Sequence, residues 1–433
     1  MKQVITIYVP AQTNRLRYIF DLIFSEQLGL DYVLTSDVQA YTQCAGYKFS
    51  YSKEKIDDGL FFEAHPILFE TNIKPQKVDK VEYKNCIGIF ECAPESEFPF
   101  DMFASAFYLL SRYEEYLPHH VDQYKRFGAS NSVAYHFRFL RQPMVNYYIE
   151  LLKETLLNRM PELVFKVHKF EFIPTYDIDN AYKHKGRGLI RNILSAGKQL
   201  LTFKLGELAE KIKVLFFRQK DPFDTYAKLD RLHKKYNLYP IYFFLINRGK
   251  NSNDTNISYR KSLFKDLVKS TKEKYEMGIH PSFYSNSNVL ELKRELSIIN
   301  GYSGKNITKS RQHFLKVKFP DTYQNLIELG ITEDYTMGYS SRPGFRTSYC
   351  HAHYWYDLSK DCTTNLRLFP FAFMDATFKY YKLYKSEKIR ERLYDLYHET
   401  KRFGGVFICV FHNDILAEER FSKIYESFLM ETN

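Results

Sequence analysis

The chain has 433 residues, of which 45% are hydrophobic and 26% charged, and its formal net charge is +11. This composition is globular, and the length exceeds what one ordinary core accommodates, so we expect two domains. The sequence shows no zinc-finger spacing, no phosphate-binding glycine loop and no RNA-binding aromatic signature, which argues against a nucleic-acid partner. An acidic glycan, a nucleotide-linked sugar or an anionic membrane surface would suit the positive charge.

Cysteine usage and the first residues indicate a cellular compartment. The six cysteines lie far apart without a C-x-x-C pair, which is typical of free thiols. Residues 1–10 contain no long apolar region and no small-residue cleavage site, so they predict a strand instead of a signal peptide. No apolar run reaches the length of a membrane span. We therefore expect a cytoplasmic protein.

Residues 1–165 are expected to form an N-terminal accessory domain of α/β type. After the first strand, hydrophobic residues recur at helical spacing over residues 16–28, 98–116 and 144–160. The domain is expected to pack against the rest of the chain or to shape access to its substrate.

The middle helix of this domain contains three neighbouring charged residues, Arg112, Glu114 and Glu115. They could form part of a site. The interpretation we favour is an ion-paired helix face that packs the two domains together.

Residues 183–220 are a predicted insertion between the first two strands of the second domain. They contain ten Lys or Arg residues and only two acids, Glu207 and Glu210, with Leu and Ile every three or four positions. A basic amphipathic helix of this kind can make peripheral contact with a membrane. It can also pack on its own protein with a solvated basic face, which is the interpretation we favour.

The remainder of the chain alternates predicted strands with predicted helices. Such alternation is typical of a parallel sheet or barrel. The expected strands or extended segments are 239–246, a short run that ends in His280, 307–315, 331–336, 366–373 and 405–411, and the expected helices are 258–274, 289–300 and 386–401.

Short motifs with acidic, histidine and arginine residues follow several of these strands. They read T-Y-D-I-D at 175–179, G-I-H at 278–280, G-F-R at 344–346 and F-H-N at 411–413. Loops from the ends of parallel strands converge at one edge of an α/β fold. Together these residue types have the composition of a metal-assisted hydrolase site.

The order of these motifs resembles the polysaccharide deacetylase family, metal-dependent enzymes that remove acetyl groups from sugars. The chain is most similar to a long, divergent bacterial branch in which an extra N-terminal domain precedes a T-x-D-x-D motif. The resemblance covers roughly residues 170–425 and implies a distorted (β/α) deacetylase-type barrel at 166–433. Further segments that resemble this branch are D-P-F-D at 221–224, S-R-Q-H-F-L at 310–315 and D-Y-T-M-G-Y at 334–339.

The resemblance implies roles for the two aspartates of the first motif. Asp177 would be the general base and Asp179 a metal ligand. Residues i and i+2 of a regular strand share one face, so both side chains could face one pocket. The alternative is a pair of aspartates that cap a loop.

The second family motif supplies two metal-binding histidines one helical turn apart, and here the sequence departs from it. His280 is present, but Tyr284 occupies the second position. His313 is the candidate for the missing ligand, and its alternatives are a substrate contact or a polar core residue. Two aspartates and two histidines would suit a divalent metal, first of all zinc. His351 and His353 are a less favoured metal pair.

Four further residues are expected to act on the base or the leaving group. Arg311 matches the arginine motif of the family and would keep Asp177 ionised. Arg346 would orient Asp177 or hold an anionic group of the substrate. His412 matches the last family motif and would protonate the leaving group, with Asp375 orienting it.

The sequence thus predicts a metal-dependent hydrolase that deacetylates an N-acetylated sugar of a cell-surface glycan or its precursor. A hydrolase of the same fold for another C–N or ester bond is one alternative. A catalytically inactive carbohydrate-binding or glycan-assembly protein is another, and a peripheral membrane scaffold that uses residues 183–220 is a third.

Overall fold

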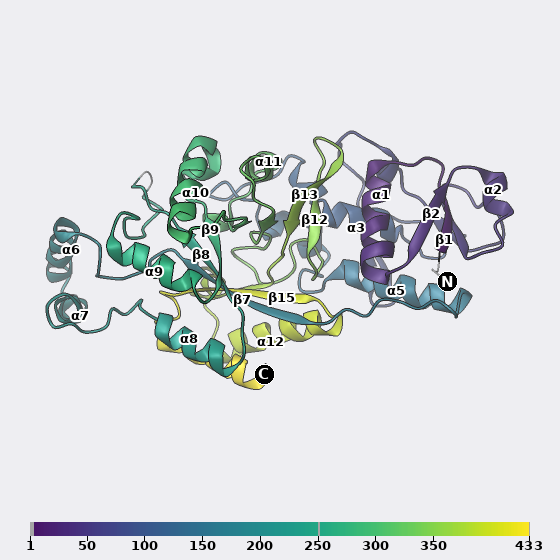
Figure 1. Ribbon diagram of the computed structural model, residues 1–433. Helices are drawn as coiled ribbons and strands as arrows, with labels where there is room; N and C mark the ends of the chain where they lie inside the picture. The colour runs from purple at the N-terminus through teal and green to yellow at the C-terminus, as the bar shows by residue number, and fades with distance from the viewer. Residues whose placement is uncertain (1–3, 250–251, 433) are drawn as a thin grey trace.

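The computed structural model describes residues 4–249 and 252–432, which form two sheets flanked by helices (Figure 1). The first sheet has four parallel strands in the order β2-β1-β3-β4. Ile5 and Ile7 are buried, as the alternating pattern of the first strand predicts. The strands are β1 (Val4–Tyr8), β2 (Asp31–Thr35), β3 (Lys48–Ser52) and β4 (Phe61–Glu63).

Helices pack beside this sheet at the positions that the hydrophobic spacing predicts. The middle helix is shorter than its run, because Asp101 caps its start and Arg112, with φ +55°, leaves the helical conformation. The elements are α1 (Asn14–Phe20), continued by the π-helix η1 (Asp21–Leu28), α2 (Val38–Thr42), α3 (Met102–Leu110), α4 (Val133–His136), α5 (Met144–Arg159) and the antiparallel pair β5 (Val81–Tyr83) and β6 (Cys86–Gly88).

The second sheet has nine strands in the order β12-β13-β11-β10-β9-β8-β7-β15-β14. Every neighbouring pair is parallel except β12 and β13. The strands are β7 (Glu171–Ile178), β8 (Ile241–Leu245), β9 (Glu276–His280), β10 (Lys309–Ser310), β11 (Glu333–Asp334), β12 (His353–Asp357), β13 (Cys362–Leu368), β14 (Phe373–Met374) and β15 (Val406–His412).

Helices lie on both sides of these strands (Figure 1), and the interior strand β8 is accordingly buried along its whole length. The helices are α8 (Tyr226–Lys235), α9 (Ser262–Lys272), α10 (Val289–Ser303), α11 (Asp321–Glu328), α12 (Ser386–Arg402) and α13 (Glu419–Thr432). The predicted α/β class is confirmed. The predicted barrel is not seen closed, since no pairing within 4–249 and 252–432 joins the end strands β12 and β14.

One predicted strand is wrong in its extent. Residues 366–373 belong to two strands that lie near opposite ends of the sheet, with β13 beside β11 and β14 beside β15. Pro370 lies between them, and proline cannot donate to a strand ladder. The extended segments 307–315 and 331–336 contain strands of only two residues each.

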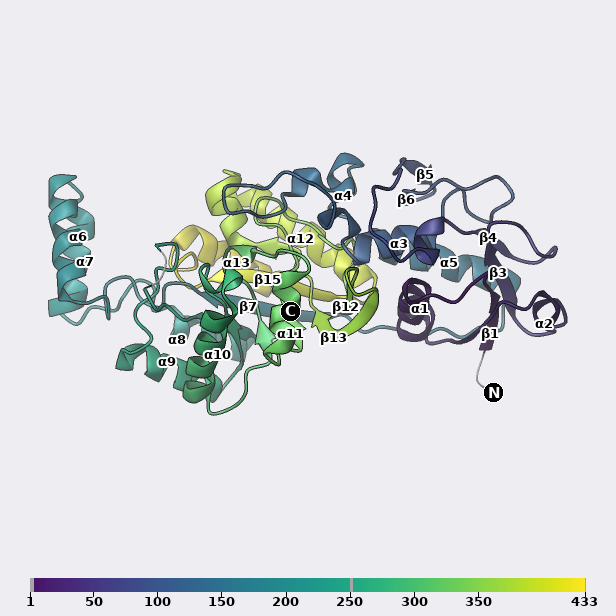
Figure 2. The same ribbon diagram turned by 90° about the horizontal axis from the view of Figure 1, so that it is seen from above.

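The predicted insertion forms a helical hairpin that projects from the rest of the molecule (Figure 2). Its helices are α6 (Leu189–Leu201) and α7 (Leu205–Phe216). They pack mainly on each other, and large hydrophobic side chains on both stay exposed. We favoured a helix whose apolar face packs on the rest of the protein. The structure instead leaves this apolar face exposed.

The molecule has two hydrophobic cores, one around each sheet. Residues from the second half of the chain contribute to the core of the first sheet. The core of the first sheet also contains Tyr339, Tyr349 and Tyr356 from the second half. All six cysteines are free, as predicted. No helix within the described ranges combines the length and the hydrophobicity that crossing a bilayer requires.

Candidate active site

The ends of three strands at one edge of the second sheet bring the predicted site residues together. Asp177 at the end of β7 lies directly beside His412 at the end of β15. His280 ends β9, which is separated from β7 by the strand β8. A pocket of about 470 Å³ opens at this edge. Most of its lining comes from the strand ends and the loops that follow them, and includes Asp177, Asp179, His280, His313, His412, Asn180, Gln312, Met374 and Asp414.

Asp179 is the centre of the cluster that could hold a metal ion. Its Oδ1 lies 3.1 Å from Nε2 of His280, and its Oδ2 lies 3.5 Å from Nε2 of His313. The three ligand atoms lie within 4.8 Å of one another. Burial alone would raise the pKa of Asp179, but the two histidines outweigh it and hold the pKa well below its usual range.

Hydrogen bonds on the far side of each imidazole fix which nitrogen faces Asp179. Nδ1 of His280 lies 2.5 Å from the carbonyl oxygen of Arg311, and Nδ1 of His313 lies 2.8 Å from Oδ1 of Asp254. Both acceptors require a proton on Nδ1, which leaves the Nε2 lone pair of a neutral ring for a metal ion. Metal-binding histidines characteristically have such partners.

An unsatisfied atom supports the same assignment. Oδ1 of Asp179 is buried and makes no well-formed hydrogen bond among the described residues, although Nε2 of His280 lies 3.1 Å from it. Leaving a buried carboxylate oxygen unpaired is costly unless a cation satisfies it. One carboxylate and two imidazole nitrogens match the donor set that zinc prefers in catalytic sites. The residues present therefore fit a divalent ion.

Asp177 is held by Arg311. Nη1 of Arg311 donates to Oδ1 of Asp177 at 2.8 Å and to Oγ1 of Thr175 at 2.7 Å, while its Nε donates to the carbonyl of Tyr335. The guanidinium also lies over the Phe243 ring, 4.5 Å from its centroid. Oδ2 of Asp177 stays directed at the cluster, 3.8 Å from Nε2 of His280.

His412 is oriented by Asp375. The carboxylate of Asp375 accepts hydrogen bonds from the backbone N–H of His412 at 2.8 Å and from its Nδ1 at 2.6 Å. Nε2 of His412 consequently faces the pocket, 3.7 Å from Oδ2 of Asp179. Burial alone would lower the pKa of His412, but the carboxylates of Asp375 and Asp179 raise it to about 10. The imidazole is therefore protonated at neutral pH.

Arg346, which was predicted to orient Asp177 or hold the substrate, does not line the pocket. Its guanidinium pairs with Glu115, at 2.9 Å from Nε and 2.5 Å from Nη2. Arg112 donates to the same carboxylate and to the carbonyl of Arg346. Glu115 and Arg112 thus form a buried ion-paired cluster between the two halves of the chain, as favoured, but they follow the end of α3 and do not lie on its face.

The remaining histidine candidates also lie outside the pocket. His351 and His353 are buried, and burial lowers their pKa values to about 3 and about 4. Tyr284, at the position of the absent family histidine, is partly exposed and does not line the pocket.

The sequence analysis missed residues that the fold brings from elsewhere. Asp254 follows β8 in a loop without a recognisable motif, and only its contact with His313 reveals it. Tyr124 and Arg126 form part of the pocket wall although they precede the second sheet by some distance in the sequence. Arg126 donates to the carbonyl of Phe314 at 2.8 Å and to the hydroxyl of Tyr381 at 2.9 Å.

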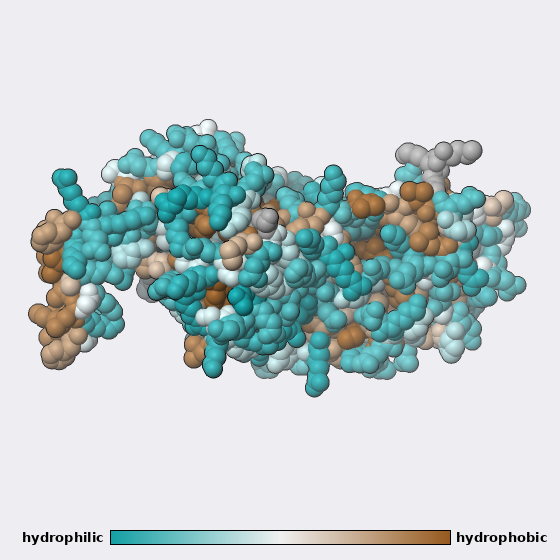
Figure 3. Space-filling model, turned by 90° about the horizontal axis from the view of Figure 1, so that it is seen from below, coloured by the Kyte–Doolittle hydropathy of each residue, from teal (hydrophilic) through white to brown (hydrophobic). Residues whose placement is uncertain are grey.

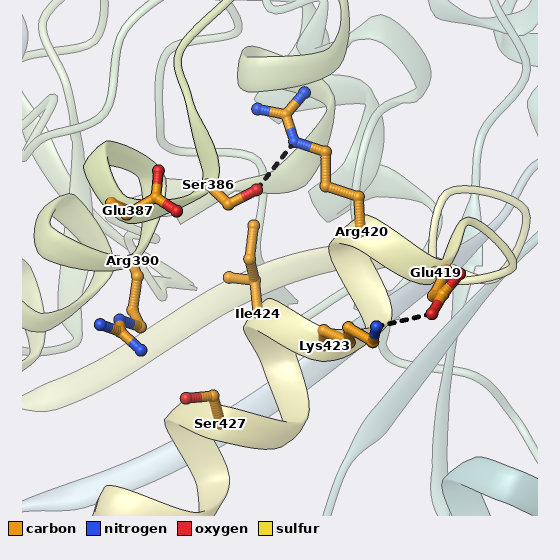
Figure 4. Close-up of a pocket in the computed structure, with 8 residues that line it drawn as sticks. All are labelled: Ser386, Glu387, Arg390, Glu419, Arg420, Lys423, Ile424 and Ser427. Carbon is orange, nitrogen blue, oxygen red and sulfur yellow. Dashed lines mark hydrogen bonds and ion pairs between the residues drawn. The ribbon is translucent and has the colours of Figure 1, made fainter.

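A second cleft between α12 and α13 lacks this chemistry (Figure 4). Arg420 donates to Ser386 there, and Lys423 pairs with Glu419 at 2.6 Å. The cleft contains no histidine, and its charged groups lie on an open surface. It is therefore not a candidate for the metal centre.

Comparisons with known proteins identify a family only for the first part of the chain. A family model described as a family of unknown function (DUF7033) matches residues 5–161. No curated protein shows significant similarity to the chain.

Three solved structures share a distant similarity with this chain. They are a provisionally assigned polysaccharide deacetylase from Mycobacterium smegmatis (12% identity, TM-score 0.40), the Puue allantoinase (10%, 0.38) and a probable polysaccharide deacetylase from Pseudomonas aeruginosa PAO1 (10%, 0.37). Each alignment covers 61% of this chain and 84%, 83% and 84% of theirs, respectively. Two of the three names are those of the family that the motifs resemble, but likeness at this level identifies no activity for this chain.

Proposed function

We propose that this protein is a metal-dependent hydrolase that removes acetyl groups from an N-acetylated sugar of a cell-surface glycan or its precursor. One observation carries the proposal. A metal-ligand cluster, a carboxylate paired with arginine and a histidine paired with aspartate all face one pocket. Amide hydrolysis at neutral pH needs a base, an acid and a means of stabilising an oxyanion, and this pocket offers groups for each.

Asp179, His280 and His313 would hold the metal ion. A divalent ion at this position would polarise the acetyl carbonyl and lower the pKa of a water molecule. Asp254 and the carbonyl of Arg311 keep the Nε2 atoms of both histidines available for it.

Asp177 would accept the proton of the attacking water. Its Oδ1 is held by Arg311, and its Oδ2 remains available at the pocket. The guanidinium of Arg311, at 2.8 Å, is the counter-charge of this carboxylate.

His412 would protonate the leaving amine from Nε2. The bond from its Nδ1 to Asp375 fixes the ring so that Nε2 faces the pocket. Because the pKa of His412 is raised to about 10, the acid is present before the reaction begins.

The substrate is proposed to be a sugar chain with anionic groups. Tyr124, Phe314, Tyr380 and Tyr381 present aromatic surfaces in the pocket, and such surfaces suit sugar rings. A neighbouring cleft of about 310 Å³ continues along the same loops and is strongly basic. Its cations are Arg138, Arg141, Arg342, Lys382 and Arg392.

The test is acetate release from oligomers of N-acetylglucosamine, both neutral and carrying anionic groups, by the wild-type protein reconstituted with zinc. We expect turnover that falls by about 10²–10⁴-fold in Asp177→Asn and in His412→Gln, the range typical of a lost acid or base. Arg420→Gln, in the cleft between α12 and α13, is the control that should retain turnover. Binding of these oligomers without acetate release would favour the catalytically inactive alternative, and hydrolysis of other amides or esters alone would favour a different substrate class.

A further inference from the structure

The α6–α7 hairpin has an amphipathic surface that plays no part in the proposed reaction. Ile193, Leu194, Leu200 and Leu201 recur at helical spacing along one face of α6. Leu205, Ile212, Leu215 and Phe216 do the same along α7, and Phe203 lies in the turn between the helices. All nine side chains are exposed.

The exposure of these side chains is extreme for a folded protein. Leu201 is 82% exposed, Phe203 87% and Phe216 75%. Figure 3 shows hydrophobic residues gathered over the hairpin at the end of the molecule. Contiguous apolar surface of this kind marks a protein or membrane contact, because water otherwise hydrates it at a cost.

Internal contacts hold the hairpin together without covering this surface. Lys211 is buried and donates to Ser195 of α6, and Val214 is buried as well. Glu210 pairs with Lys183 at 2.8 Å at the base of the hairpin. The apolar faces therefore stay exposed although the two helices are packed.

The positive charge of residues 183–220 indicates which kind of partner would bind the hairpin. Residues 183–220 contain ten Lys or Arg and two acids, a net charge of +8. The two acids are already paired, Glu207 with Lys204 and Glu210 with Lys183. A second copy of the hairpin would bring +8 against +8, whereas a surface of anionic lipids complements both the charge and the apolar face.

We propose that the α6–α7 hairpin docks the protein on an anionic membrane surface. The helices have 13 and 12 residues, and at about 1.5 Å per residue each is roughly 20 Å long, too short to cross a hydrocarbon core of about 30 Å. The hairpin lies in the plane of the interface, with its leucines and phenylalanines among the acyl chains and its lysines at the headgroups. This contact is independent of the proposed catalytic function.

The test is sedimentation of the full-length protein with vesicles of phosphatidylcholine, with and without phosphatidylglycerol. We expect binding that depends on phosphatidylglycerol and falls by about tenfold or more in the triple variant Leu201→Ser, Phe203→Ser, Phe216→Ser. The matched control replaces three equally exposed residues elsewhere with serine: Val167 (84% exposed), Tyr239 (77%) and Leu383 (89%). It should bind as the wild type does.

The same samples separate apolar docking from charge alone. Apolar docking predicts that part of the wild-type binding survives high salt, since screening weakens only the electrostatic contribution. The proposal is overturned if the wild type ignores both kinds of vesicle, or if the triple variant binds as tightly as the control. It is also overturned if light scattering shows a wild-type dimer that the triple variant abolishes, because a second copy would then occupy the surface. Circular dichroism of each variant verifies that the fold is retained.

Discussion

Nη1 of Arg311 donates a hydrogen bond to Oδ1 of Asp177 across 2.8 Å, and both side chains are buried. The two residues are 134 positions apart in the sequence. The contact joins the loop after β10 to the end of β7, and it gives the proposed base a buried counter-charge.

Replacing Arg311 should lower the free energy of unfolding and also slow the reaction. Arg311→Met leaves the buried Asp177 without its counter-charge, so we expect the free energy of unfolding to fall by about 3–5 kcal/mol. Urea unfolding measures this difference. Arg402→Met removes a pair of the same length, Arg402 with Glu150 at 2.8 Å, that is partly exposed. It should cost less than about 1 kcal/mol, and equal losses in the two variants would contradict the account.

Arg346 should act on stability and not on chemistry. Arg346→Met leaves Glu115 paired with Arg112 only, and we expect a loss of about 3 kcal/mol in the free energy of unfolding. Below the unfolding transition, kcat should stay within about threefold of the wild type, since Arg346 does not line the pocket. A stable Arg346→Met protein with kcat reduced about a hundredfold would instead support the catalytic role predicted from the sequence.

Asp375 should set the alkaline limit of activity. The raised pKa of His412, about 10, comes mainly from Asp375, so Asp375→Asn should let the imidazole lose its proton at lower pH. The alkaline limb of kcat/KM should therefore move down by about one pH unit or more. An unchanged limb would mean that His412 is not the acid.

The free energy of unfolding offers a second test of the pair formed by His412 and Asp375. The folded-state pKa of His412 lies above its ordinary value of 6.5, so its contribution is fully present below that pH and is lost as pH rises through about 10. The difference in unfolding free energy between the wild type and Asp375→Asn should accordingly shrink between these two limits. Urea unfolding at several pH values measures it.

Asp254 should matter to the metal although it is not proposed as a ligand. Asp254→Asn removes the charged acceptor for Nδ1 of His313, and the loss of such a partner typically costs about 10–100-fold in metal affinity. Competition with a chromophoric chelator measures the affinity for zinc. Thr255→Val, at the next position and in the pocket lining, is the control.

The sequence predicted most of the site because strand ends are readable from it. A hydrophobic run followed by an acid or histidine identifies Asp177, His280 and His412, and parallel pairing then brings them to one edge. It also supplied His313 as a replacement for the histidine absent at Tyr284. Which of two arginines pairs with Asp177 depends on the path of the loops, so sequence alone did not separate Arg311 from Arg346.

The parts that escaped prediction have physical reasons. β10 and β11 are too short to show a periodicity of two, and Pro370 splits one hydrophobic run between distant strands. Asp254 reaches the site from an irregular loop. The amphipathic character of residues 183–220 was evident, but periodicity gives the apolar face of a helix and not what covers it.

The most direct test of the metal-centre assignment is the metal content of the purified protein, with Asp179→Asn, His280→Ala and His313→Ala beside the wild type. Glu419→Gln, in the cleft between α12 and α13, is the control. The account predicts about one equivalent of zinc or another divalent ion in the wild type and the control, and at least about tenfold less in each of the three variants. A wild type that holds no divalent ion after reconstitution, or three variants that retain it fully, would contradict the assignment.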